Sequence, residues 1–302
     1  MNALQEIILS LKAEKNALIL AHYYQTADIQ EIADHVCDSF AMAQRAYEAK
    51  EELLIICGVH FMAESAKLLN PDKTVLLPVR DAGCPMANMA DPGEVTALRA
   101  RYPDAAVISY VNTSAAVKAV SDVCCTSSSA AKIARALPEK RIIFIPDRNL
   151  GAYVATQTPE KEIILFSGYC PVHDFASKTD VAAAKTAYPG ASLLVHPECR
   201  EEVLQQADYV GSTEGIIAQA LQSAAGEFII GTENGVVERL KKLAPEKKFY
   251  PLRSGFDCAD MKKTRLSDVY NALESGEFEI LLNSDIIEGA AKALRRMVEL
   301  GS

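Results

Sequence analysis

Three segments of the chain share one order of apolar and polar positions. "ALILAHYYQTADIQEIAD" ends at Asp34, "AVISYVNTSAAVKAVSD" at Asp122 and "SLLVHPECREEVLQQAD" at Asp208. Each segment begins with a continuous apolar run, passes through a polar step and continues with the period of an amphipathic helix. The three aspartates are spaced 88 and 86 residues apart. A repeat at this interval predicts three copies of one folding unit.

A second helical pattern and a further apolar strand follow in each copy. These strands are "TVLLPV", "RIIFIPD" and "EFIIG". Continuous apolar strands that alternate with helices are typical of parallel sheets covered on both faces. We therefore predict an α/β fold of three similar αβα three-layer sandwich domains, arranged with pseudo-threefold symmetry around a central active site.

The repeat also predicts the domain boundaries. The expected units are residues 1–84, 85–170 and 171–264, with the helices of residues 265–302 packing back on the first unit. Ser284 is expected to cap the last of these helices, "DIIEGAAKALRRMVEL", because serine is a favoured N-cap residue.

Polar residues recur at equivalent places in the three copies. They are His22, Tyr110 and His196 just after or at the end of the first strand, Tyr24, Asn112 and Glu198 two residues later, and Ser39, Ser127 and Thr213 before the second helix, the last preceded by Ser212. Ligands of open parallel sheets bind beyond the carboxyl ends of the strands, so converging units would place these groups around one cavity. Solvated strand ends and plain helix caps are the alternatives, and recurrence in all three copies favours a site. The hydroxyl groups precede helices, whose N-termini suit phosphate or carboxylate.

Three cysteines keep nearly the same period. Cys84 in "DAGCPMA", Cys170 in "SGYCPVH" and Cys258 in "GFDCADM" are 86 and 88 residues apart, and Cys199 has no counterpart in the other copies. Three thiolates meeting at one point indicate a metal site. Zinc would usually take a fourth protein ligand, such as His173. An iron–sulfur cube is normally held by four cysteines, so with three one iron would keep an open position for Lewis-acid chemistry.

Composition and charge narrow the class of protein. The 302 residues are 49% hydrophobic and 24% charged, as in an ordinary folded protein, and the net charge of −9 argues against nucleic acid or an anionic membrane as partner. No apolar run approaches the ~20 residues of a membrane span. The N-terminal segment is typical of an amphipathic helix rather than a signal peptide, and the chain contains no CxxC pair. We therefore expect a cytoplasmic protein whose cysteine thiols are reduced.

Long motifs in order along the chain resemble the quinolinate synthase family. They include "AHYYQ", "GVHFMAESAKLLNP", "GCPMA", "YVNTSAAVKA", "PDRNLGAYV", "GYCPVH", "HPEC", "GSTEGI" and "CADMKKT". The resemblance implies an enzyme of NAD biosynthesis that condenses iminoaspartate with dihydroxyacetone phosphate to quinolinate, releasing phosphate and two waters. It also implies a 4Fe–4S cluster on Cys84, Cys170 and Cys258. Some members carry a CxxC motif near the third ligand, and its absence after Cys258 predicts that this thiol switch is missing.

The resemblance and the chemistry together suggest roles for the polar residues. Glu198 and Tyr24 are the general acid–base candidates, and His22 and His196 would bind or polarise carbonyl and hydroxyl oxygens. Tyr110 completes the set of catalytic candidates. The substrate-binding set is His22, Ser39, Tyr110, Asn112, Ser127, His196, Glu198, Ser212 and Thr213. Ser212 with Thr213 is expected to bind phosphate, and Ser39 with Ser127 to bind carboxylates.

Partners and competing functions follow from the same chemistry. A transient contact with the enzyme that supplies iminoaspartate is expected, because this imine hydrolyses readily. Two other functions stay open on sequence alone. One is a three-unit small-molecule binding protein with zinc or no metal, and the other is an electron carrier, which would need no substrate cavity.

Overall fold

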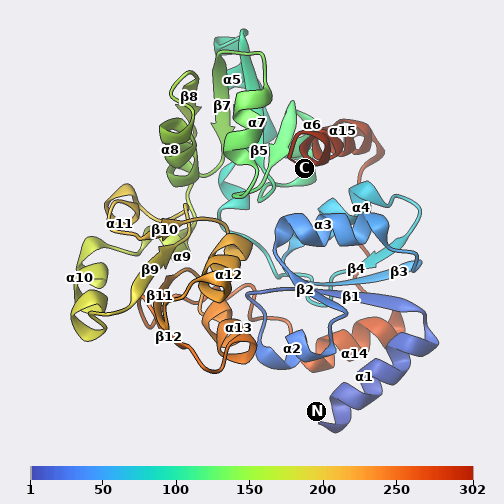
Figure 1. The fold of residues 1–302 in the computed structure, drawn as a ribbon. Coiled ribbons are helices and arrows are strands. Elements are labelled where there is room, and N and C mark those ends of the chain that lie inside the picture. Colours follow the sequence, from blue (N-terminus) through green and yellow to red (C-terminus); the bar gives the residue numbers. More distant parts are fainter. Residues whose placement is uncertain (1, 302) are drawn as a thin grey trace.

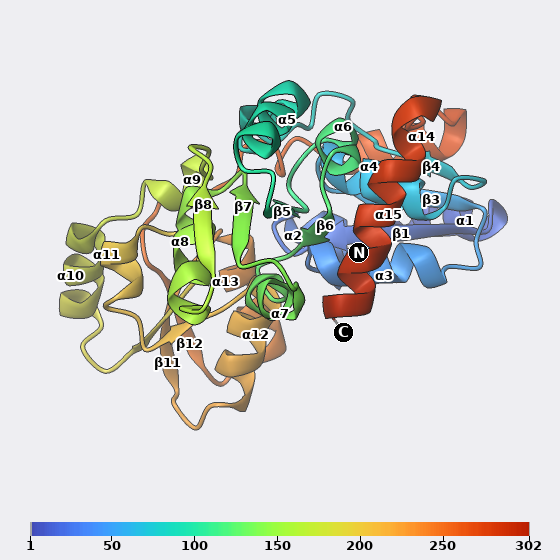
Figure 2. The ribbon, with the colours of Figure 1, turned by 90° about the horizontal axis from the view of Figure 1, so that it is seen from above.

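The computed structural model describes residues 2–301 as three α/β units, each with its own four-stranded parallel sheet (Figure 1). The strand orders are β2-β1-β3-β4, β6-β5-β7-β8 and β10-β9-β11-β12. The α/β class and the three parallel sheets are confirmed. In Figure 1 the three units lie around a common centre, and in Figure 2, seen from above, the second unit lies between the third and the first.

The first unit carries the N-terminal sheet and its covering helices. Its elements are α1 Ala3–Glu14, β1 Ala17–His22, α2 Ala27–Ile32, β2 His35–Cys37, α3 Ser39–Glu48, β3 Leu53–Cys57, α4 His60–Leu69 and β4 Thr74–Leu76. Every residue of β1 is buried, because this strand lies between β2 and β3 and is covered on both faces.

The second unit repeats this order after a short 3₁₀ helix. Its elements are η1 Ala87–Met89, α5 Pro92–Arg101, β5 Ala105–Tyr110, α6 Ala115–Ala119, β6 Val123–Cys125, α7 Ala130–Ala136, β7 Arg141–Ile145, α8 Arg148–Gln157 and β8 Glu162–Leu165. β5 is buried along its whole length, like β1.

The third unit is followed by the two C-terminal helices. Its elements are α9 Pro171–Asp174, α10 Lys178–Ala187, β9 Ser192–Val195, α11 Glu201–Leu204, β10 Tyr209–Val210, α12 Thr213–Gln222, β11 Glu227–Gly231, α13 Gly235–Leu243 and β12 Lys248–Pro251, and then come α14 Leu266–Ser275 and α15 Ser284–Gly301. Each sheet falls inside one of the predicted ranges, whose boundaries we keep as a proposal. Residues 1 and 302, the outer limits of those ranges, lie outside the described part.

The repeat aspartates make an equivalent hydrogen bond in each of the three sheets. The side chains of Asp34, Asp122 and Asp208 accept hydrogen bonds from the backbone N–H groups of Ile19, Val107 and Leu193, at 2.8, 2.7 and 2.7 Å. Each bond joins the start of the edge strand to the middle of the first strand of its sheet. The aspartates that reveal the repeat therefore also help to fix strand register within each unit.

One strand correspondence predicted from the pattern is wrong. Thr74–Leu76, within "TVLLPV", forms the fourth strand of its sheet, whereas Arg141–Ile145 and Glu227–Gly231 form third strands. The third strand of the first unit is Leu53–Cys57. In each unit a helix and the third strand are followed by another helix and the fourth strand, and the two pairs have similar hydrophobic patterns. Hydrophobic periodicity alone therefore does not distinguish the third strand from the fourth.

The C-terminal helices do not both pack on the first unit. α14 does, against α1 and β3, but α15 packs mainly against α6, β6 and α7 of the second unit and also contacts α4 (Figure 2). At the start of α15 the side chain of Asn283, rather than that of Ser284, accepts the N–H of Asp285, at 3.1 Å. α15 thus connects two units instead of completing one.

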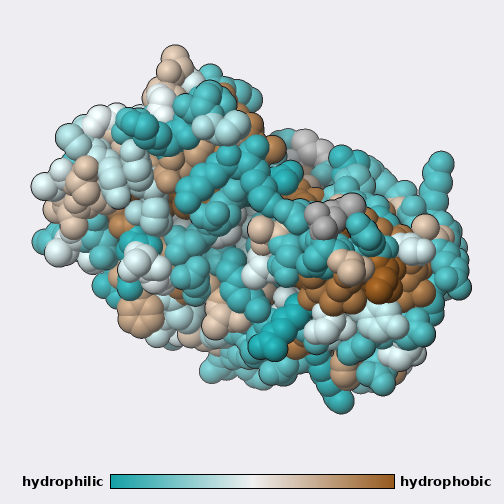
Figure 3. Space-filling view, turned by 90° about the horizontal axis from the view of Figure 1, so that it is seen from below, coloured by the Kyte–Doolittle hydropathy of each residue, from teal (hydrophilic) through white to brown (hydrophobic). Residues whose placement is uncertain are grey.

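The molecular surface is largely hydrophilic on the face seen from below. Figure 3 shows polar residues over most of this face, and its most extended hydrophobic area lies on the right, on the side of the first unit. Across residues 2–301, none of the helices combines the length and the apolar character that crossing a bilayer would require.

Candidate active site

One cavity receives side chains from all three units. It is lined by His22, Tyr24, Ser39, Tyr110, Asn112, Ser127, His196, Glu198, Thr213 and the three cysteines Cys84, Cys170 and Cys258. Apolar groups such as Phe61, Met62 and Met261 complete the wall. The structure therefore brings together every residue predicted from the repeat except Ser212.

Glu198 is the most connected polar group of this cavity. One carboxylate oxygen accepts the hydroxyl of Tyr110 at 2.6 Å, and the other lies 2.8 Å from Nδ1 of His173. Burial alone would raise the pKa of Glu198, but the imidazoles of His196 and His173, with hydrogen bonds from His173 and Tyr110, hold that pKa below its usual range. The group is therefore a buried carboxylate held between two units.

His22 and His196 have matching backbone contacts. Nδ1 of His22 accepts the N–H of Tyr24 at 3.2 Å, and Nδ1 of His196 accepts the N–H of Glu198 at 3.3 Å. Burial lowers the pKa of His22 to about 3 and that of His196 to about 4, so both rings are neutral at neutral pH. Since Nδ1 is the acceptor in each ring, the proton lies on Nε2, which can donate a hydrogen bond.

Tyr24 crosses from the first unit to the third. Its hydroxyl lies 3.0 Å from Oγ1 of Thr213 and 3.0 Å from Oγ1 of Thr232. Thr232 is also 2.9 Å from Nε2 of His173. Burial raises the pKa of Tyr24 well above its usual value, so the ring is a neutral phenol.

Of the predicted serine, threonine and asparagine residues, all but one line the cavity, and the remaining one caps a helix. Ser39 and Thr213 are the first residues of α3 and α12, and Ser127 lies 3.3 Å from Nε2 of His196. Ser212 is the N-cap of α12 and accepts the N–H of Gly215 at 3.1 Å; among the described residues it is not part of the cavity wall. Asn112 lines the cavity, and its side-chain oxygen is buried with no hydrogen-bond partner within residues 2–301.

The three cysteines predicted as metal ligands line this cavity. Burial raises the pKa of Cys84 to about 12, of Cys258 to about 11 and of Cys170 well above its usual value, so the metal-free thiols are protonated. Backbone N–H groups two or three residues further on donate to each sulfur and oppose this rise; they include those of Ala87, His173 and Met261. A cation would favour the thiolates in the same way, as sulfur ligands require.

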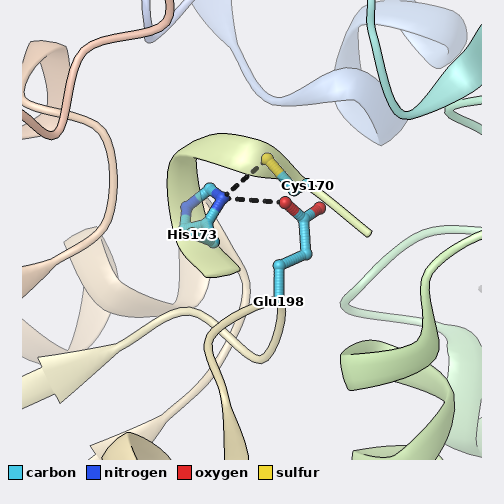
Figure 4. A group of neighbouring side chains, drawn as sticks. All are labelled: Cys170, His173 and Glu198. Carbon is cyan, nitrogen blue, oxygen red and sulfur yellow. Dashed lines mark hydrogen bonds and ion pairs between the residues drawn. The ribbon is translucent and has the colours of Figure 1, made fainter. Parts of the chain in front are cut away.

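A mixed group of possible ligands adjoins Cys170. The ligand atoms of Cys170, His173 and Glu198 all lie within 4.8 Å of one another, and Figure 4 shows the imidazole directed at both the sulfur and the carboxylate. Nδ1 of His173 is 3.2 Å from the sulfur. These are three ligand atoms, and a structural zinc site usually has four protein ligands, so this geometry alone does not select zinc.

Sequence reasoning missed two polar residues of the centre. It named His173 only as a zinc ligand and did not name Thr232, although each contacts a predicted residue. His173 follows Cys170 by three residues, which puts both on one helical turn. Thr232 follows β11 directly, so the strand-end argument applied to third strands would have found it.

The sequence comparisons agree with this architecture. A family model described as quinolinate synthetase A protein matches residues 6–299. A protein of Caldicellulosiruptor saccharolyticus named quinolinate synthase is 54% identical over 290 residues, which cover 96% of each chain. Proteins with the same name from Alkaliphilus metalliredigens and Methanoregula boonei are each 50% identical, over 96% and 98% of both chains. The chain therefore belongs to the quinolinate synthetase A protein family.

Proposed function

We propose that the protein condenses iminoaspartate with dihydroxyacetone phosphate to form quinolinate, with release of phosphate and two waters. The observation that carries this proposal is the convergence of the polar groups and three cysteines from three units on one cavity. The names of the relatives support the reaction class.

Both proposed substrates are anions, and the cavity offers them neutral donors. Thr213 and the first N–H groups of α12 are the proposed phosphate site, since a helix N-terminus favours an anion. Ser212 would contribute by capping that helix. Ser39 and Ser127 are the proposed carboxylate donors, and the unpartnered oxygen of Asn112 would accept from the substrate amine or a hydroxyl.

Glu198 is the proposed general base. It is ionised in the resting site, where Tyr110 and His173 contact its two oxygens and hold it in position to take a proton from the substrate. Tyr24 has the opposite character, because a phenol with a raised pKa donates a hydrogen bond and does not take a proton from carbon. Nε2–H of His22 and of His196 would polarise carbonyl and hydroxyl oxygens.

We propose that a 4Fe–4S cluster occupies the three cysteines. The donor set fits such a group, and when bound it would supply a Lewis-acidic iron for the loss of hydroxide. Cys84, Cys170 and Cys258 come one from each unit, so the cluster site requires the assembled molecule. A transient contact with the enzyme that makes iminoaspartate completes the proposal.

Turnover of the iron-reconstituted protein tests the function. The protein is purified without oxygen, its iron and sulfide are measured, and quinolinate is quantified with both substrates and with each alone. Quinolinate that forms only with both substrates and only in cluster-loaded protein supports the proposal. Stoichiometric zinc without turnover would favour the binding-protein alternative, and a reversible redox couple without turnover would favour the electron carrier.

A further inference from the structure

Two buried carboxylates lie behind the cysteine loops. Asp147 and Glu233 are both 0% exposed. Asp147 accepts the backbone N–H of Cys170 at 3.0 Å, and Glu233 accepts that of Cys258 at 3.2 Å. Within the described chain neither carboxylate belongs to the cavity wall. Their contacts are with the loops that carry the thiols.

The two carboxylates occupy equivalent places in the repeat. Asp147 is two residues beyond β7, and Glu233 is two residues beyond β11. Val59 holds the same place beyond β3 in the first unit. Its side chain contains no polar atom, so it can offer no hydrogen bond to the Cys84 loop.

All three loops share the rest of their backbone support. The N–H groups of His60, Arg148 and Asn234 donate to the residue two before each cysteine, always at 2.8 Å. Each cysteine carbonyl also accepts the N–H four residues further on, at 3.2, 2.8 and 3.2 Å. The three cysteine loops therefore share the same backbone hydrogen bonds, and in the described part of the chain only the loops of the second and third units are also bonded to a buried carboxylate.

Each carboxylate uses both oxygens. The other oxygen of Asp147 accepts the N–H of Leu150 at 2.7 Å and so caps α8. The other oxygen of Glu233 accepts the N–H of Gly235 at 2.7 Å, while the first also pairs with Lys262 at 2.9 Å. An amide has only one acceptor oxygen, so asparagine or glutamine at these places can hold the helix or the loop but not both.

We propose that Asp147 and Glu233 are positioning residues that fix the Cys170 and Cys258 loops for metal binding, and that Cys84 is the least restrained of the three ligands. Cys84 also lines a second hollow, together with His60 and Arg80. The inference rests on the proposed metal centre, but it concerns loop order that exists before any metal binds.

Residue-specific thiol labelling of the metal-free protein tests this. Asp147→Asn should increase the alkylation rate of Cys170 without changing that of Cys258, and Glu233→Gln should do the reverse. The increase should be about tenfold, the loss expected for one hydrogen bond to a charged group. The control is Glu64→Gln, because Glu64 is a buried carboxylate that accepts the N–H of Ala115 at 2.9 Å; this variant should leave the alkylation rates of Cys170 and Cys258 unchanged. Unchanged rates, or an equal rise in all three cysteines, would overturn the proposal.

Amide hydrogen exchange in the wild-type metal-free protein needs no variant. Peptides that contain Cys170 and Cys258 should exchange more slowly than the peptide that contains Cys84. Equal or faster exchange at Cys170 and Cys258 would contradict the proposal even if the variants failed to fold. Neither experiment depends on turnover, so absence of quinolinate formation would sink the proposed function and leave this inference standing.

Discussion

Residues of similar type take different roles because their packing differs. Ser212 and Thr213 are neighbours with hydroxyl side chains, yet one caps α12 and the other lies in the cavity wall. Tyr110 bonds to a carboxylate, whereas Tyr24 bonds to two threonines. The recurrence in the sequence predicted where these residues gather. It did not predict the hydrogen-bond partners of Tyr110 and Tyr24, because these partners belong to a different unit.

Glu198→Gln should abolish most turnover while the fold is kept. The amide is nearly the same shape, but it is not a base and cannot accept from both Tyr110 and His173. A loss of ~10²–10⁴-fold in kcat is expected for a general acid–base group. Iron content measured on the same sample controls for damage to the cluster site. Turnover within a few-fold of wild type would make Glu198 a binding residue only.

Thr213→Val and Ser212→Ala should separate binding from stability. Removing the Thr213 hydroxyl should weaken the triose phosphate by ~1–3 kcal/mol, more than it weakens the dicarboxylate. Removing the Ser212 cap should instead lower the free energy of unfolding by ~1 kcal/mol. KM for each substrate and thermal melting of both variants check this. Equal effects of Thr213→Val on the two substrates would place the phosphate elsewhere.

At the scale of elements, α9 joins the second unit to the third. Its last residue, Asp174, bonds to Arg148 and Asn149 of α8, and to Arg200 just before α11, at 3.0, 2.9 and 3.0 Å. The neighbouring His173 and Cys170 are part of the cavity. Hydrophobic patterning predicted the strands around this junction. It did not indicate α9, because a four-residue helix has too few positions to show a period.

Asp174→Asn should lower the free energy of unfolding, because it weakens the contacts at this junction. The loss should be larger at neutral pH than at acid pH. Burial opposes ionisation, but Arg200, Asn149 and Arg148 lower the pKa of Asp174. A lowered carboxyl pKa stabilises the folded state above the unfolded value of about 4, and that stability is lost as the pH falls through the folded value. The variant should lose ~1–3 kcal/mol at pH 7, with the difference from wild type shrinking in acid.

Asp104→Asn is the matched control for the junction. Asp104 also pairs with an arginine, Arg141, at 2.9 Å, but its side chain is 64% exposed. Exposed pairs contribute only ~0–1 kcal/mol, so this variant should melt close to wild type. Equal losses in the two variants would show that Asp174 has no special role at the interface.

At the scale of the molecule, the sequence predicted the fold better than it predicted the contacts within the candidate active site. The place of Asp34, Asp122 and Asp208 in the pattern is a local property of each unit, since each aspartate accepts a hydrogen bond from the residue fifteen positions earlier in its own sheet. The position of α15 across two units depends instead on which apolar surfaces remain open after the units assemble. The contact of His173 with Glu198 likewise joins α9 to the segment after β9, and no periodicity in the sequence specifies that these two segments meet.

The last prediction concerns all three units at once, because the cluster site is shared among them. Cys84→Ser, Cys170→Ser and Cys258→Ser should each reduce iron and sulfide, measured after anaerobic reconstitution, well below one cluster per chain. Cys124→Ala and Cys199→Ala should keep the cluster; their side chains are 0% exposed, so a loss of packing is the effect expected of them. Melting temperature separates that loss from a loss of ligation. If Cys199→Ala lost iron as fully as Cys170→Ser did, without a fall in melting temperature, Cys199 would be a ligand and the one-cysteine-per-unit arrangement would be wrong.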